Sequence, residues 1–323
     1  MFAYCLAALA AVSLVVTPAA GQEYPAKPIV LLVPFAAGGP TDTVGRSLAQ
    51  GMGKALKQTI VVENAVGAGG TIAPAKLKAA PPDGYTILLA HIGMSTAPAL
   101  YRSLPFKPLE DFELVGQVVD VPMTLIGKKD MPPNDLRELI AYLKANKDKV
   151  SFANAGVGSA SHLCGLLFMS TIQTELTTIP YKGTAPAIND LLGGQVDILC
   201  DQTTNTTQYI KAGRVKAYGT TSKTRLDSLK ELPTLSEAGL PGFEVVVWHG
   251  IYAPRGTPKP VIDKLIAALQ AGIEDPVFVQ RMSDLGSQVV TRDKATPDGL
   301  RARLRAEIDR WTPIIRKAEV YAD

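Results

Sequence analysis

Short apolar runs and amphipathic segments alternate through most of the chain. Apolar runs predict buried strands at 28–33, 59–63 and 85–90, and shorter strands at 151–153, 177–180 and 196–200 continue the alternation. Segments with apolar positions three or four residues apart predict helices at 41–56, 71–79, 134–146, 159–171, 185–192, 261–273 and 300–315. Alternating strands and helices indicate an α/β fold. Segment 253–260 is dense in proline and glycine, so it is either a linker or a crossing between domains.

The first 21 residues differ from the rest because they carry no charged side chain. Residues 6–16 form an apolar run, and Ala19 and Gly21 place small residues at the −3 and −1 positions of a cleavage site. This pattern predicts a secretory signal peptide at 1–21 and a periplasmic protein that begins at Gln22, with Gly21 as the alternative first residue. The alternative is a single membrane anchor, for which the run is short.

Composition narrows the function classes. The chain has 323 residues, enough for two domains, and a net charge of +3 without basic clusters, which argues against a nucleic-acid partner. Beyond the signal segment, Cys164 and Cys200 are the remaining cysteines, and they form either a disulfide or two buried thiols. Neither lies in a predicted ligand loop, so no role in ligand binding is expected for them.

Two glycine-rich segments, 33–42 and 154–162, each follow a predicted strand and lead into a predicted helix. Glycines let a ligand approach the backbone, and the free N–H groups at a helix N-terminus favour an anion. Thr41 or Asp42 is expected to cap the first helix, and Ser159 and Ser161 offer hydroxyl groups at the second. Two such loops predict a carboxylate held from two sides.

Enzyme motifs are missing from the sequence. His91, His162 and His249 have no metal-ligand spacing to another His or Cys, so no metal site is expected. The segment Gly156-Val-Gly158-Ser159 does not match the Gly-x-Ser-x-Gly pattern of a nucleophile turn. The sequence also lacks a complete dinucleotide-binding or phosphate-loop motif. We therefore expect a binding protein without cofactor rather than an enzyme.

An ordered series of motifs covers essentially all of the chain after residue 21. It comprises Pro25-Ala-Lys-Pro-Ile29, Pro34-Phe-Ala-Ala-Gly-Gly-Pro-Thr-Asp42, Val61-Val-Glu-Asn64, Gly67-Ala-Gly-Gly70, Pro82-Asp-Gly-Tyr-Thr86, Pro180-Tyr-Lys-Gly183, Leu191-Leu-Gly-Gly-Gln-Val-Asp197, Lys211-Ala-Gly-Arg214, Pro233-Thr234, Ser236-Glu-Ala-Gly239, Trp248 and Ala253-Pro-Arg-Gly-Thr-Pro258. Through these motifs the chain resembles the extracytoplasmic substrate-binding receptors of the tripartite tricarboxylate transporters, the Bug family.

The resemblance implies a two-lobed periplasmic binding protein of type II-like fold, with a ligand cleft between α/β lobes. It implies a first lobe of residues 22–124 with 249–323 and a second lobe of 125–248. It also implies carboxylate capture by residues from both lobes. The positions that match are Phe35, Ala36, Ala37, Gly38, Gly39, Thr41, His91, Gly156, Gly158, Ser159, His162, Tyr181, Gly183 and Asp201.

The sequence also departs from the family pattern. Ala65-Val66 replaces the usual Arg-Pro pair, and both cysteines are atypical. Segments 91–95 and 202–207 also have sequences unlike those of the family. These departures concern the end of the pocket that sets selectivity. The expected function is a monomeric receptor that passes a small organic carboxylate to membrane permease subunits. An accessory that reports ligand to a membrane signalling protein is the alternative, and a secreted hydrolase is a third. The residues do not identify the carboxylate.

Overall fold

A computed structural model describes residues 23–317 and 321–322 of the chain. The signal peptide expected at 1–21 lies outside these residues. None of the helices in the described part combines the length and the apolar character that a bilayer crossing requires.

The first half of the molecule is built on parallel strands β1, β2 and β3. The apolar run that predicts β1 is buried, and helices on both sides cover it. This half contains β1 (Ile29–Val33), α1 (Pro40–Leu56), β2 (Ile60–Asn64), η1 (Ala68–Gly70), α2 (Ile72–Lys78), β3 (Thr86–His91), α3 (Gly93–Leu100), α8 (Lys259–Glu274), α9 (Pro276–Asp284), β10 (Gln288–Val289) and α10 (Pro297–Lys317).

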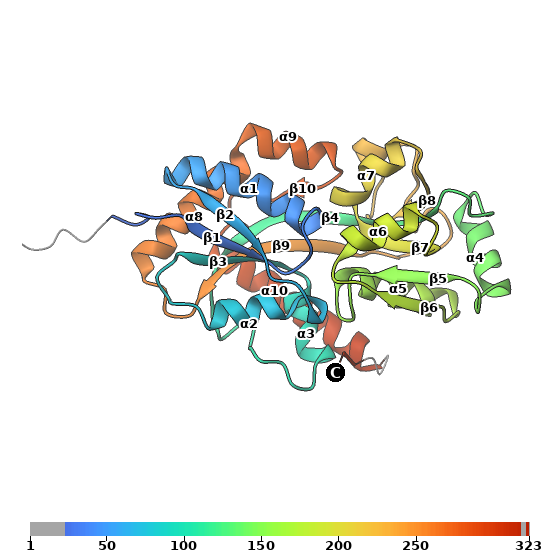
Figure 1. Cartoon of the computed structure of the whole chain (residues 1–323), viewed down its shortest axis with the longest axis horizontal. Helices are drawn as coiled ribbons and strands as arrows, with labels where there is room; N and C mark the ends of the chain where they lie inside the picture. Colours follow the sequence, from blue (N-terminus) through green and yellow to red (C-terminus); the bar gives the residue numbers. More distant parts are fainter. Residues whose placement is uncertain (1–22, 318–320, 323) are drawn as a thin grey trace, which may run out of the picture.

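The second half has its own small sheet, in which β5 pairs in parallel with β6 and β7. Figure 1 shows this half to the right of the first, with its helices around the sheet. It contains α4 (Leu136–Ala145), β5 (Ser151–Asn154), α5 (Ala160–Ile172), β6 (Thr177–Pro180), α6 (Thr184–Leu192), β7 (Ile198–Gln202), α7 (Thr203–Lys211) and β8 (Val215–Thr220).

Two long antiparallel strands, β4 (Phe112–Lys128) and β9 (Val246–Pro254), connect the halves (Figure 1). Up to Pro122, β4 pairs with β9, and from Met123 onward it pairs with β7 and β8. The strand order is therefore β2-β1-β3-β9-β4-β7-β5-β6. Segment 253–260 joins β9 to α8, and α8 packs against α1 and β4 in the first half.

The predicted strands and helices correspond to β1, β2, β3, β5, β6 and β7 and to α1, α2, α4, α5, α6, α8 and α10. The elements that the sequence pattern missed are β4, β8, β9, β10, α3, α7 and α9. Segment 91–95, which is idiosyncratic in sequence, is the end of β3 followed by the start of α3.

Candidate functional site

The loop after β1 is held in shape by Asp42, which lies in the first turn of α1. Its buried carboxylate accepts hydrogen bonds from the Gly38 backbone N–H (2.9 Å), the Arg46 Nε (2.8 Å) and the Asn64 Nδ2 (2.9 Å). Burial acts to raise the pKa of Asp42, but these bonds, that of Arg46 foremost, lower it below its usual value. The expected side-chain cap by Thr41 or Asp42 is wrong, because Gly39 is the N-cap residue and no side chain caps it.

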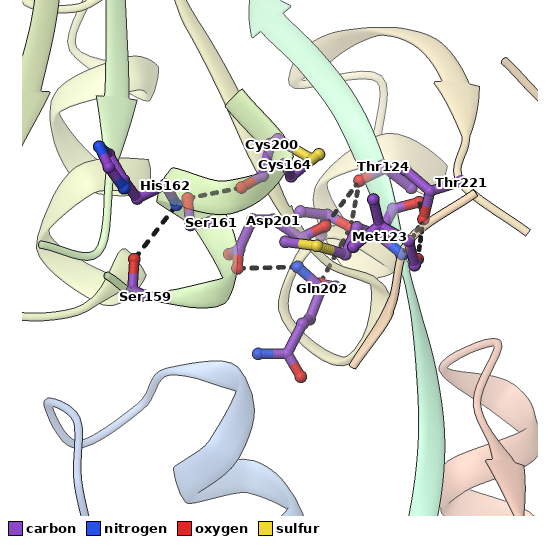
Figure 2. The surroundings of a disulfide bond; sticks show 12 residues. Met123, Thr124, Ser159, Ser161, His162, Cys164, Cys200, Asp201, Gln202 and Thr221 are labelled. Atoms are coloured by element: carbon purple, nitrogen blue, oxygen red, sulfur yellow. Dashed lines mark hydrogen bonds between the residues drawn. A yellow bond between two sulfur atoms is a disulfide. The ribbon is translucent and has the colours of Figure 1, made fainter. Parts of the chain in front are cut away.

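The loop after β5 is organised by Ser159 and His162. Ser159 is the N-cap residue of α5, and its Oγ accepts a hydrogen bond from the His162 backbone N–H at 3.2 Å (Figure 2). The His162 Nδ1 in turn accepts one from the Gly158 backbone N–H at 3.2 Å. Burial lowers the pKa of His162 to about 4, so the ring is neutral at pH 7 and can accept this bond. Gly158 has a φ of +84°, a backbone conformation that glycine adopts without strain.

The C-terminal end of β7 carries a buried carboxyl group. Asp201 is 1% exposed, and its oxygens accept hydrogen bonds from the Asn205 Nδ2 (2.7 Å) and the Gln202 backbone N–H (2.8 Å). Burial raises the pKa of Asp201 to about 7, although the bonds from Asn205 and Gln202 act in the opposite direction. The side chain therefore changes its charge close to neutral pH.

These loops surround one cavity at which four helix N-termini meet. Thr41 lies in the first turn of α1, Ser159 caps α5, Thr184 begins α6 and Gln202 precedes α7. The cavity is lined by Phe35, Pro40, Thr41, His91, Ala155, Ser159, Ala160, Ser161, Thr184, Asp201 and Gln202. Each N-terminus contributes free N–H groups and the positive end of a helix dipole. The site is therefore suited to an anion.

Two aromatic rings, those of Phe35 and His91, form the wall on the side of the first half, and His249 packs against His91 without lining the cavity. Phe35 stacks on His91 with ring centroids 4.9 Å apart, and His249 lies edge-on to His91 at 5.7 Å. The His91 Nδ1 accepts a hydrogen bond from the Gly93 backbone N–H, and burial lowers the pKa of His91 to about 4. Because burial also lowers the pKa of His249 well below its usual value, neither ring supplies a formal positive charge at pH 7.

The halves touch on both sides of this cavity. The Ala36 backbone N–H donates to the Lys182 carbonyl oxygen at 3.3 Å, and a side chain on Gly69 would clash with the Val157 carbonyl oxygen. The space available to a water centre in the cavity is about 10 Å³, which is room for one water molecule. The structure is therefore a closed form, and a larger ligand needs the halves to move apart before it can enter.

Sequence-predicted site residues fall into three groups. Those that line the cavity are Phe35, Thr41, His91, Ser159 and Asp201. Gly158 lines a neighbouring cavity, next to Tyr101 and Met94. Those that line neither cavity are Ala36, Ala37, Gly38, Gly39, Gly156, His162, Tyr181 and Gly183, of which Gly38 and His162 support the loops.

The sequence prediction did not name Thr184 or Gln202 as ligand-binding residues, although it assigned segment 202–207 to the end of the pocket that sets selectivity. The only available signal was their place after a predicted strand, at the start of the helix that follows. Gln202 has a buried Oε1 without a hydrogen-bond partner among the described residues, so it can receive a donor from a ligand or water. Within residues 23–317 and 321–322, no group of three or more His, Cys, Asp or Glu side chains is placed to hold a metal ion.

Comparison with known proteins identifies relatives along most of the chain. The family model of the tripartite tricarboxylate transporter family receptor matches residues 44–320. The UPF0065 protein in the TAR-I ttuE-ttuC' intergenic region of Agrobacterium vitis is 46% identical over 299 residues, which are 93% of this chain and 86% of the relative.

Solved structures agree with these relatives. The periplasmic binding protein BugD matches with a TM-score of 0.91 and 55% identity, over 92% of this chain and 99% of BugD. MatC from Rhodopseudomonas palustris with bound malate matches with a TM-score of 0.87 and 39% identity, over 90% of this chain and all (100%) of MatC. The expected α/β periplasmic-binding-protein fold is confirmed.

Proposed function

The chain belongs to the family of tripartite tricarboxylate transporter receptors, and we propose that it is a periplasmic receptor that binds a small organic carboxylate and delivers it to membrane permease subunits. It acts as a monomer and performs no catalysis. The observation that carries the proposal is the convergence of four helix N-termini on one cavity.

Backbone groups are the main carriers of positive potential at this cavity. No Lys or Arg is among the residues that line it, and His91, the histidine in its lining, is neutral at pH 7. An anion that leaves water for this cavity exchanges hydrogen bonds from water for hydrogen bonds from the unpaired backbone N–H groups of the first helical turns. The malate in the related MatC structure is a ligand of this chemical class.

We propose that the lobes have the boundaries 22–124 with 249–323 and 125–248. The exchange of β4 partners between Pro122 and Met123 supports the first boundary, and β9 at Val246–Pro254 lies at the return. Ligand binding then closes the lobes about β4 and β9, and the ligand shifts a pre-existing open–closed equilibrium. The contacts across the cavity are those of the closed state.

A thermal-shift screen of mono-, di- and tricarboxylates against the chain that begins at Gln22 tests the binding. A ligand that binds only the folded state adds about 2.7 kcal/mol of stability at 100 times its Kd, so a specific carboxylate raises Tm by several degrees. Matched alcohols and amides are the controls. If no carboxylate raises Tm more than its amide, the proposal is wrong.

Delivery to a transporter is tested separately. Uptake of the identified carboxylate is measured in cells that carry the permease subunits with or without this receptor. Uptake that needs the receptor supports delivery. Uptake that is unchanged, together with capture of a signalling protein by the ligand-bound receptor, supports the sensor alternative instead.

A further inference from the structure

Cys164 and Cys200 form a disulfide that joins helix α5 to strand β7 (Figure 2). Their Cα atoms are 6.1 Å apart, and both residues are buried. The open question from the sequence, whether the two cysteines form a bridge, is answered by this bond. The oxidising periplasm proposed for this protein is a compartment in which such a bond persists.

The bridge lies directly behind the ligand cavity. Cys164 is one helical turn after Ser161, which lines the cavity, and the Ser161 hydroxyl donates to the Cys200 carbonyl oxygen at 2.6 Å. Cys200 immediately precedes Asp201, which also lines the cavity. The bridge therefore connects the second turn of α5 to the strand end that leads into α7.

Little else fixes these two segments to each other. Among the residues that the structure describes, the Ser161–Cys200 bond is the one hydrogen bond that joins α5 to β7. The remaining contact is apolar packing, which is non-directional and tolerates small shifts of a helix along a sheet. A covalent link one turn from the cavity limits such shifts.

We propose that the Cys164–Cys200 disulfide positions the ligand site by fixing the N-terminus of α5 against the N-terminus of α7. This inference rests on the proposed carboxylate binding. It replaces the expectation that the cysteines have no part in ligand capture. Binding sites need their donors held within about 0.5 Å of the productive arrangement, and preorganised donors bind with less loss of conformational freedom.

The test compares ligand affinity with stability. The double variant Cys164→Ala/Cys200→Ala is made, and its affinity for the best carboxylate from the screen is measured by calorimetry at a temperature where circular dichroism shows it folded. We expect affinity to fall about tenfold, mainly through faster dissociation. A second double variant, Cys164→Val/Cys200→Ala, refills the space of the sulfur atoms if the first does not fold.

The matched control is Leu143→Ala, which removes buried apolar volume from α4 in the same half but away from the cavity. It lowers Tm and is expected to leave affinity unchanged, so a loss of affinity through general destabilisation would appear in the control too. Affinity within about threefold of the parent protein in a folded cysteine variant overturns the inference. If the unmodified protein binds no carboxylate, the proposed function has failed instead.

Discussion

The hydroxyl group of Tyr101 lies 3.2 Å from the carbonyl oxygen of Val157, across the boundary between the two halves of the molecule. Tyr101 is the C-cap residue of α3 in the first half, and Val157 belongs to the loop before α5 in the second. The same hydroxyl donates to the Ala68 carbonyl oxygen at 2.8 Å. One side chain therefore touches a backbone segment from each half in the closed form.

Tyr101→Phe should weaken ligand binding, although the hydroxyl that it removes does not contact the ligand. The single phenolic proton is shared between the carbonyl oxygens of Ala68 and Val157, so losing the share that spans the closed halves costs the closed form at most about 1 kcal/mol, or at most about fivefold in affinity. Calorimetry and stopped-flow dissociation measure it. Tyr142→Phe in α4, outside the cavity, is the control. Equal affinities in the two variants would show that Tyr101 does not contribute to closure.

A second contact between the halves involves one face of α7. Thr203 and Thr207 donate to the carbonyl oxygens of Gly286 (3.5 Å) and Leu285 (3.2 Å), at the end of α9. Figure 1 shows these two helices side by side at the top of the molecule. Thr203→Val/Thr207→Val keeps the side-chain shape but removes both donors, so the closed form should be less populated.

For this α7 variant we expect a three- to tenfold loss of affinity, about 1 kcal/mol. Small-angle scattering of the ligand-free protein should give a larger radius of gyration than the parent protein. Thr171→Val, in an exposed position of α5, is the control. An unchanged radius together with unchanged affinity would contradict a role in closure.

Asp201 should make stability depend on pH near neutrality. Because burial raises its pKa to about 7, the folded protein binds more protons than the unfolded chain between about pH 4 and pH 7. Its contribution therefore favours folding at low pH and is lost as pH rises through that window. In Asp201→Asn, the loss of Tm between pH 5 and pH 8 should be smaller than in the parent protein. Asp148→Asn, in an exposed turn, should keep the parent's dependence of Tm on pH. If Tm changed with pH equally in the parent protein and in both variants, Asp201 would not be the group responsible.

The elements that the sequence predicted and those that it missed differ in their local chemistry. β1 is an apolar run and β5 a short segment around Phe152, and each leads into a glycine-rich turn, so local pattern identifies both strands and the loops that follow. β4 contains Gly116, Asp120 and Pro122 and is buried along nearly its whole length, so neither alternation nor a continuous apolar run marks it. Its partners change at Met123, a property of the assembled sheet.

The candidate site, too, was predictable from the sequence only where a local pattern marks it. The loops of Phe35 and Ser159 were predictable because a helix start after a strand has a recognisable sequence. Helix α7 begins with Thr203 and Thr204, which have modest helix propensity, and Thr203 and Thr207 are buried where they contact the end of α9 in the other half. That Gln202 lines the cavity depends on these long-range contacts, which no local pattern contains.

Gly158 provides the sharpest test of anion capture by backbone groups. Gly158→Asp puts a carboxylate beside the N-terminus of α5, where it competes with the ligand for the helix dipole. The new Cβ would also lie 3.2 Å from the Tyr101 hydroxyl oxygen. We expect at least about a hundredfold loss of affinity, or 2–3 kcal/mol. Lys147→Asp, an exposed charge change after α4, should leave affinity almost unchanged.

Gly158→Asn separates charge from bulk in that test. Asn has nearly the size of Asp and tolerates a positive φ better than most residues, but it brings no charge. If charge opposes the ligand, Asn at this position should bind about tenfold more tightly than Asp, and the difference should shrink in high salt as the field is screened. Equal losses for Asn and Asp would mean that bulk beside Tyr101 is the cause. Full affinity in both variants would remove the α5 N-terminus from the binding site. Gly38→Asp should cost less, because Gly38 is exposed, lines neither cavity and already donates its N–H to Asp42.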